Sequence, residues 1–293
     1  MKFLKFNSKN FSISFGLGFI FFLSLTWLIL EFTTPRLPLL GFHGIIDVNT
    51  PADKSVPVQM EYPKQDLEIF LEYLVRHNYW FLTTQDLYDY FLTKSKEIPA
   101  GHLNQKPIMI SFDDGYKTVY TNLVPILDKL EQKYSQKVKV VLFINPGTLA
   151  TPKSIASTHL GCKELREGLK KGFYDIQSHG LNHKKLTQIS TQDLIEELLQ
   201  AQTDLRSCTK GLDPEQKVAS HLAYPYGAYN KQVEKYASKY YLSSYLYNSR
   251  ILKYCWLKNY YEIPRLTINR GKPASRLIKM AQRSHQIKKK EKC

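Results

Sequence analysis

The sequence predicts an α/β protein in which helices cover a parallel sheet, preceded by an N-terminal transmembrane helix. Three observations support this prediction. Short β-rich runs alternate with longer helical segments after Pro35. The β-rich runs are nearly continuous in apolar residues, as strands buried on both faces are. Segment 11–32 is apolar and carries no charge before Glu31.

Segment 11–32 is long enough for a helix to cross a bilayer. It lacks the small-x-small site of a cleaved secretory signal, which favours an uncleaved signal anchor. Lysines within residues 1–10 precede it and Glu31 follows, so the positive-inside rule places residues 1–10 in the cytoplasm. We therefore expect a membrane-anchored domain at 33–270 outside the cytoplasm, in the periplasm or at the cell surface.

The eight expected strands are β-rich runs, several of them flanked by Gly, Pro or Asn. They are 37–42, 79–83, 107–112, 138–144, 174–178, 218–224, 242–247 and 261–268. Apolar residues at three- and four-residue spacing predict the helices. These are 66–75, 84–92, 122–130, 163–171 and 190–207, the last with Ser190 as its N-cap. This alternation leaves an open doubly wound sheet and a closed barrel as alternatives.

The net charge of +15 favours contact with polyanions such as nucleic acid, anionic lipid or acidic wall polymers. Part of the surplus lies in segment 271–293, which we expect to be a solvated basic tail rather than a nucleic-acid-binding arm. No glycine-rich phosphate loop follows an early strand, which argues against nucleotide binding. The cysteines Cys162, Cys208, Cys255 and Cys293 form no CxxC pair, and one pairing among the first three stays open.

Polar side chains follow the expected strands at their carboxyl ends, where barrel enzymes carry their chemistry. Asp113 and Asp114 follow the third strand, and adjacent residues leaving a strand can divide metal binding from proton acceptance. His179 and His183 follow the fifth strand at the four-residue spacing that lets two imidazoles hold one cation. Each motif alone is more often a structural turn. Together they form a 2-His-1-carboxylate set, which serves hydrolysis as well as redox chemistry.

Three further residues satisfy the same strand-end criterion. Pro225 stiffens a Tyr-Pro-Tyr-Gly turn, so that Tyr226 can present its backbone N–H outward. His43 follows the first expected strand and Arg265 lies in the last. A lone histidine or arginine is more often structural, but a barrel closes its first strand beside its last.

Three motifs, SFDDGY at 111–116, SHGLNH at 178–183 and AYPYGAYN at 223–230, occur in this order. Together they resemble the NodB-homology polysaccharide deacetylases, carbohydrate esterase family 4, over about residues 37–270. GFHG at 41–44 is similar to the poly-β-1,6-N-acetylglucosamine deacetylase type. The resemblance implies a distorted (β/α)7-type NodB-homology barrel. It also implies metal-dependent removal of N-acetyl groups from an extracellular aminosugar polymer of the poly-N-acetylglucosamine, peptidoglycan or chitin type.

Site roles follow from the resemblance. Asp114, His179 and His183 would hold a divalent metal, zinc first, with cobalt or nickel as alternatives. Asp113 would be the general base toward metal-activated water, and the Tyr226 N–H would donate to the oxyanion.

The sequence departs from the family's commonest pattern at two places. Ala223 stands where an arginine usually precedes the Pro-Tyr motif, and no Leu-x-His follows it. His43 is therefore assigned as the general acid. Arg265 is assigned as the replacement arginine that orients Asp113 through a charge-assisted hydrogen bond.

Rival functions remain. A glycosidase also uses two carboxylates, but these must lie about 5–9.5 Å apart across a sugar, which adjacent Asp113 and Asp114 cannot easily do. A related C–N hydrolase or esterase is a second alternative. The alternative from another class is a membrane-tethered carbohydrate-binding protein of the same fold without catalysis, which would have no need of a free base.

Overall fold

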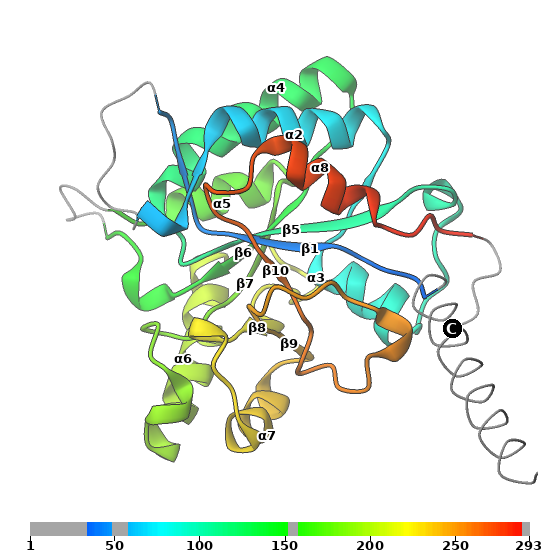
Figure 1. Cartoon of the computed structure of the whole chain (residues 1–293). Coiled ribbons are helices and arrows are strands. Elements are labelled where there is room, and N and C mark those ends of the chain that lie inside the picture. The colour runs from blue at the N-terminus through cyan, green and yellow to red at the C-terminus, as the bar shows by residue number, and fades with distance from the viewer. Residues whose placement is uncertain (1–33, 49–57, 152–157, 289–293) are drawn as a thin grey trace, which may run out of the picture. The chain divides into compact units, whose positions relative to one another are not determined.

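The centre of the fold is an eight-stranded parallel sheet with the order β10-β1-β5-β6-β7-β8-β9, in which β4 also pairs with β5 (Figure 1). The computed structural model describes residues 34–48, 58–151 and 158–288. The strands are β1 (Leu39–Phe42), β4 (Trp80–Phe81), β5 (Pro107–Asp113), β6 (Val140–Ile144), β7 (Tyr174–Ser178), β8 (His221–Ala223), β9 (Ser243–Tyr245) and β10 (Leu266–Thr267). Each lies within or overlaps one of the eight predicted strands, so the prediction of a parallel sheet is confirmed.

The sheet curls, so that segment 263–266 contacts β9 at one end of the strand order and leads into β10 at the other end. Backbone hydrogen bonds join Ile263 to Ser244 of β9 at 3.1 Å and to Leu246 at 2.8 Å. A few residues later, β10 pairs with β1 in parallel, with Leu266 opposite Leu40. The last strand therefore lies beside the first, as the sequence predicted.

Helices cover the sheet. They are α2 (Lys64–Arg76), the short α3 (Thr84–Asp86), α4 (Val124–Tyr134), α5 (Cys162–Lys170), α6 (Thr191–Cys208), α7 (Lys231–Tyr240) and α8 (Ala274–Gln282). Helices α2, α4 and α8 lie together, and α6 packs beside α7 (Figure 1). All five predicted helices are present, and the predicted cap is confirmed because Ser190 Oγ accepts from the backbone N–H of Asp193 at 3.1 Å. Helices α7 and α8 were not predicted.

A second, two-stranded parallel sheet pairs β2 (Gly44–Ile46) with β3 (Glu61–Pro63). The sequence did not predict it, because three residues are too few to show a strand's periodicity. It follows β1 directly, with His43 between the two strands.

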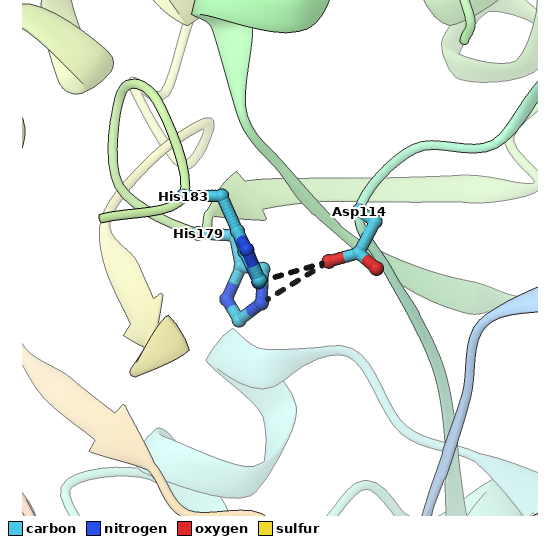
Figure 2. A group of neighbouring side chains, drawn as sticks. All are labelled: Asp114, His179 and His183. Atoms are coloured by element: carbon cyan, nitrogen blue, oxygen red, sulfur yellow. Dashed lines mark ion pairs between the residues drawn. The ribbon is translucent and has the colours of Figure 1, made fainter. Parts of the chain in front are cut away.

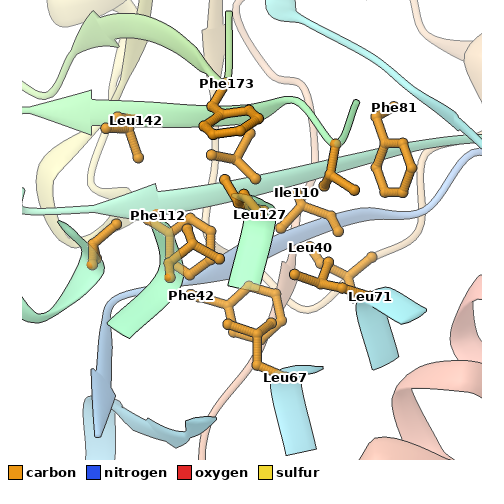
Figure 3. Close-up of a cluster of buried hydrophobic side chains, with 14 of the residues drawn as sticks. Leu40, Phe42, Leu67, Leu71, Phe81, Ile110, Phe112, Leu127, Leu142 and Phe173 are labelled. Carbon is orange, nitrogen blue, oxygen red and sulfur yellow. The ribbon is translucent and has the colours of Figure 1, made fainter. Parts of the chain in front are cut away.

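The main core lies between the sheet and the helices α2 and α4 (Figure 3). Phe42 of β1 and Phe112 of β5 are in register, and their rings stack with centroids 5.3 Å apart. Side chains of both helices pack on this layer, among them Leu67 and Leu127. Because Phe42 is level with Phe112, the next residues of the two strands, His43 and Asp113, leave the sheet side by side.

The prediction of a solvated tail from residue 271 is wrong for its described part. Leu277 and Ala281 on one face of α8 are buried, and Ile287 beyond the helix is buried too. The helix packs against α2. The prediction relied on the many lysines and arginines of this segment and overlooked an apolar stripe at helical spacing. That stripe packs the segment against the rest of the fold.

Segments 1–10 and 11–32 lie outside the described residues, so the predicted anchor stays a prediction. Among the described residues, no helix combines the length and the apolar character needed to cross a membrane. Of the cysteine pairings left open, Cys162 with Cys208 is present as a disulfide, with Cα atoms 5.4 Å apart. It joins the first residue of α5 to the last of α6.

Candidate metal centre

Two strand ends supply the candidate metal ligands. Strand β5 ends at Asp113, so Asp114 begins the loop, and His179 directly follows β7. Asp114 and Gly115 both have left-handed backbone, with φ of 68° and 74°. A side chain at Gly115 would place its Cβ 2.9 Å from Ile144. The glycine therefore permits the tight turn that aims the Asp114 carboxylate across the end of the sheet.

The three predicted ligands converge. The Asp114 Oδ1 atom lies 3.5 Å from His179 Nε2 and 3.3 Å from His183 Nε2, and Figure 2 shows both imidazoles facing the carboxylate. One potential ligand atom from each residue lies within 4.8 Å of the others. Ligand atoms at the usual distances around one tetrahedral zinc ion lie about 3.3 Å from each other. The spacing of these side chains therefore suits a single cation.

The chemistry of the donors fits a divalent cation as well. Burial lowers the pKa of His179 to about 3 and also lowers that of His183, so both imidazoles are neutral at pH 7. The backbone carbonyl of Ala223 lies 2.8 Å from His179 Nδ1, which fixes the proton there and leaves Nε2 as a free donor. Asp114 Oδ1 is buried and has no hydrogen-bond partner among the described residues. A cation would satisfy that orphaned oxygen.

Asp113 is held apart from this cluster by a buried arginine. Arg265 Nη1 and Nη2 donate to the two Asp113 carboxylate oxygens at 2.7 and 2.8 Å, and Nη1 also donates to Ser111 Oγ at 3.0 Å. The guanidinium lies 4.8 Å from the ring centre of Phe143 and 5.6 Å from that of Tyr247. Burial alone would raise the pKa of Asp113, but the Arg265 charge and hydrogen bonds outweigh it and lower this pKa to about 2. Asp113 is therefore an ionised, oriented carboxylate.

His43 lies close to Asp113 and Asp114. Its side chain is buried, and its ring meets that of Tyr247 edge to face with centroids 5.2 Å apart. The positive charge of a protonated His43 contributes to lowering the pKa values of Asp113 and Asp114. Its Nδ1 atom has no hydrogen-bond partner among the described residues.

Tyr226 lies at the exposed edge of the candidate metal site. Its side chain is 64% exposed, and its ring centroid lies 4.5 Å from that of His183. Its backbone is left-handed, with φ of 60°. The structure thus brings all seven predicted site residues to one end of the sheet.

A model of the polysaccharide deacetylase family matches residues 100–244, which include Asp113, Asp114, His179, His183 and Tyr226. Residues 100–244 are therefore a polysaccharide deacetylase domain. His43 and Arg265 lie outside the matched residues.

The relatives that match the chain carry names of the same kind. YxkH of Bacillus subtilis, a putative polysaccharide deacetylase, is 26% identical over 70% of this chain and 61% of its own length. The poly-beta-1,6-N-acetyl-D-glucosamine N-deacetylase of Staphylococcus aureus is 28% identical over 57% of this chain and 54% of its own. The chain thus spans less than two thirds of either relative. The deacetylase PplD of Streptococcus pyogenes shares the fold, with a TM-score of 0.69 at 21% identity over 85% of this chain and 99% of that one.

Sequence reasoning missed Glu197 of α6. Its buried carboxylate accepts hydrogen bonds from the backbone N–H groups of Leu181 and Asn182 at 3.0 and 2.9 Å. These residues form the loop between the ligands His179 and His183, so Glu197 positions both. The sequence offered one sign of this role: Glu197 lies within the apolar stripe of the predicted helix, three residues after Leu194, where a buried carboxylate needs hydrogen-bond donors.

Glu197→Gln is expected to lower metal affinity about 10- to 100-fold, because the amide replaces one strong acceptor with a donor that faces the loop N–H groups. Competition with a zinc chelator measures this effect independently of turnover. Glu196→Gln, a change at the exposed neighbouring position, is the matched control. Equal affinities for the two variants would show that Glu197 does not position the ligands.

Metal binding is also expected to weaken as the pH falls. Burial raises the pKa of Asp114 to about 6, with the neighbouring Asp113 charge adding to the rise and His43 opposing it. Below that pH a proton competes with the cation for this carboxylate, so apparent affinity should fall about tenfold per pH unit. His179, with a pKa of about 3, does not compete in this range. Zinc titrations between pH 5 and 8 measure the slope, and a flat profile from pH 5 to 7 would contradict the assignment of Asp114.

Proposed function

We propose that the chain is a metal-dependent N-deacetylase of an N-acetylated aminosugar polymer, acting outside the cytoplasm. One observation carries this proposal. The three-ligand cluster of Asp114, His179 and His183 lies beside Asp113, an ionised carboxylate that Arg265 keeps out of the ligand set. A binding protein has no need of a separate base next to its metal ligands. The name of the Staphylococcus aureus relative supports the polymer class.

We also propose that the curled sheet is a distorted (β/α)7-type barrel and that residues 33–270 hold the catalytic domain. The contacts of segment 263–266 with β9 and with β1 support the barrel. Two features support the location outside the cytoplasm, the apolar segment 11–32 and the Cys162–Cys208 disulfide, since such bonds persist in oxidising compartments.

A divalent cation, zinc first, would be held by Asp114, His179 and His183 and would supply a Lewis acid that polarises the acetyl carbonyl and acidifies water. The chain's own groups do the rest. Asp113 takes the proton of the attacking water while Arg265 keeps its carboxylate oriented. The Tyr226 N–H donates to the oxygen that gains charge. His43 gives a proton to the departing nitrogen, so that the amide C–N bond breaks into acetate and an amine.

Acetate release tests the function. The full chain is incubated with β-1,4-linked chito-oligosaccharides, β-1,6-linked N-acetylglucosamine oligomers and peptidoglycan. We expect acetate from at least one of them, loss of release with a chelator, and recovery with added zinc or cobalt. Chelator-resistant release would contradict the metal role, and glycan binding without any acetate would favour a non-catalytic carbohydrate-binding protein.

A further inference from the structure

A shallow hollow of about 590 Å³ adjoins the metal centre. It is lined by His183, Lys184, Lys185, Gln188, Ile189 and Tyr226. Two lysines thus directly follow a metal ligand, both are exposed, and this lining contains no acidic side chain. We call Lys184 and Lys185 the basic rim.

The basic rim is held in place at both ends. On one side stands the ligand His183, and on the other Leu186, which is 1% exposed and packs in a core cluster with α6 and α7. Lys184 Nζ lies 3.7 Å from Glu197, whose carboxylate already accepts the loop hydrogen bonds. Lys185 has no ion-pair partner among the described residues. The backbone of the basic rim is therefore held beside the metal centre, where Lys184 is paired with Glu197 and Lys185 carries an exposed positive charge.

A second hollow beside the Tyr226 turn is basic too. Gly227, the next residue, lines this hollow of about 730 Å³. Its charged lining consists of Arg250, Lys253 and Arg283 against Glu262 alone. Both hollows that adjoin the Tyr226 turn are therefore lined by more basic than acidic side chains.

That charge offers no electrostatic attraction to a neutral polymer. Each N-acetyl group removed leaves an amine that is protonated at neutral pH, and the basic rim repels it. A carboxylate or phosphate beside the acetylated sugar would instead be attracted and would place that sugar over the metal centre. We propose that the basic rim recognises an anionic substituent next to the N-acetylated sugar, so that the substrate is an anionic aminosugar polymer. This proposal rests on the proposed deacetylase function and narrows its substrate.

Kinetics of the full chain on matched oligomers tests the proposal. The three oligomers are a neutral N-acetylglucosamine pentamer, an oligomer of the same length with alternating carboxylate-bearing sugars, and one with phosphate substituents. In the double variant Lys184→Gln/Lys185→Gln, the ratio of kcat/KM for an anionic over the neutral oligomer should fall about tenfold, and the difference from wild type should shrink in high salt. The carboxylate and phosphate oligomers show which anion is preferred.

Lys129→Gln/Lys133→Gln is the matched control, because it removes two exposed charges from α4. It should leave the ratio unchanged. An unaltered ratio in Lys184→Gln/Lys185→Gln, or an equal drop in the control, would overturn the proposal. Binding titrations of the same oligomers to the wild type and to both double variants, under conditions without turnover, measure binding affinity independently of kcat/KM. Anion-dependent binding with no acetate from any oligomer would therefore refute the deacetylase function and leave the basic rim supported.

Discussion

Asp113→Asn is expected to lower kcat about 10²- to 10⁴-fold while metal remains bound, because the proton acceptor is lost and the three ligands are not. Substrate affinity should change much less. The measurements are acetate release under saturating substrate and zinc content by competition titration. Asp114→Asn should differ, with metal affinity and turnover falling together. If Asp113→Asn instead loses the metal while Asp114→Asn keeps it, the two carboxylates have exchanged roles.

Folding has to be separated from chemistry in this experiment. Asp113→Asn leaves the fully buried Arg265 without its counter-charge, which costs about 3–5 kcal/mol of stability. The double variant Asp113→Asn/Arg265→Gln removes both charges and should recover part of that loss, as a thermal midpoint would show. It should remain as inactive as the single variant. Recovery of activity together with stability would make the carboxylate structural.

The metal cluster could be predicted because its ligands follow the carboxyl ends of two strands. Apolar runs locate β5 and β7, and parallel strands bring their carboxyl ends to one edge of the sheet. Asp114, His179 and His183 could therefore be expected at one edge, although the role of Glu197 in holding the loop between the histidines could not. The helices α2 to α6 were predicted from their apolar spacing.

Contacts made across the sheet were harder to predict. The salt bridge from Arg265 to Asp113 joins residues 152 positions apart. It requires β10 to lie beside β1 and β1 beside β5, an order that periodicity does not encode. The resemblance to the family suggested this partner, whereas the residues alone left Arg265 as a structural arginine. The ring of Tyr247, which touches both His43 and Arg265, gave no signal, since it is one tyrosine among 20.

His43 has a position that suits a general acid. The Phe42–Phe112 register places it beside Asp113, although 70 residues separate the two in the chain. Tyr247 packs against one edge of its ring, and the buried Nδ1 has no partner among the described residues that would fix the ring in a structural hydrogen bond. A structural histidine at this depth would normally have its buried nitrogen satisfied.

His43→Ala is expected to slow N-acetyl hydrolysis about 10²- to 10³-fold, because an amine leaves poorly unless a proton reaches its nitrogen as the C–N bond breaks. An activated aryl acetate has a leaving group that needs little protonation, so its hydrolysis should fall less than about tenfold. Comparing kcat/KM for the two substrates isolates the acid step, and zinc affinity and thermal midpoint show whether the site and fold survive. His43→Gln, which retains a polar side chain but donates no comparable proton, should behave like His43→Ala. Equal losses on amide and ester would instead assign His43 to positioning the acetyl group, because a residue that only orients the substrate affects both leaving groups alike.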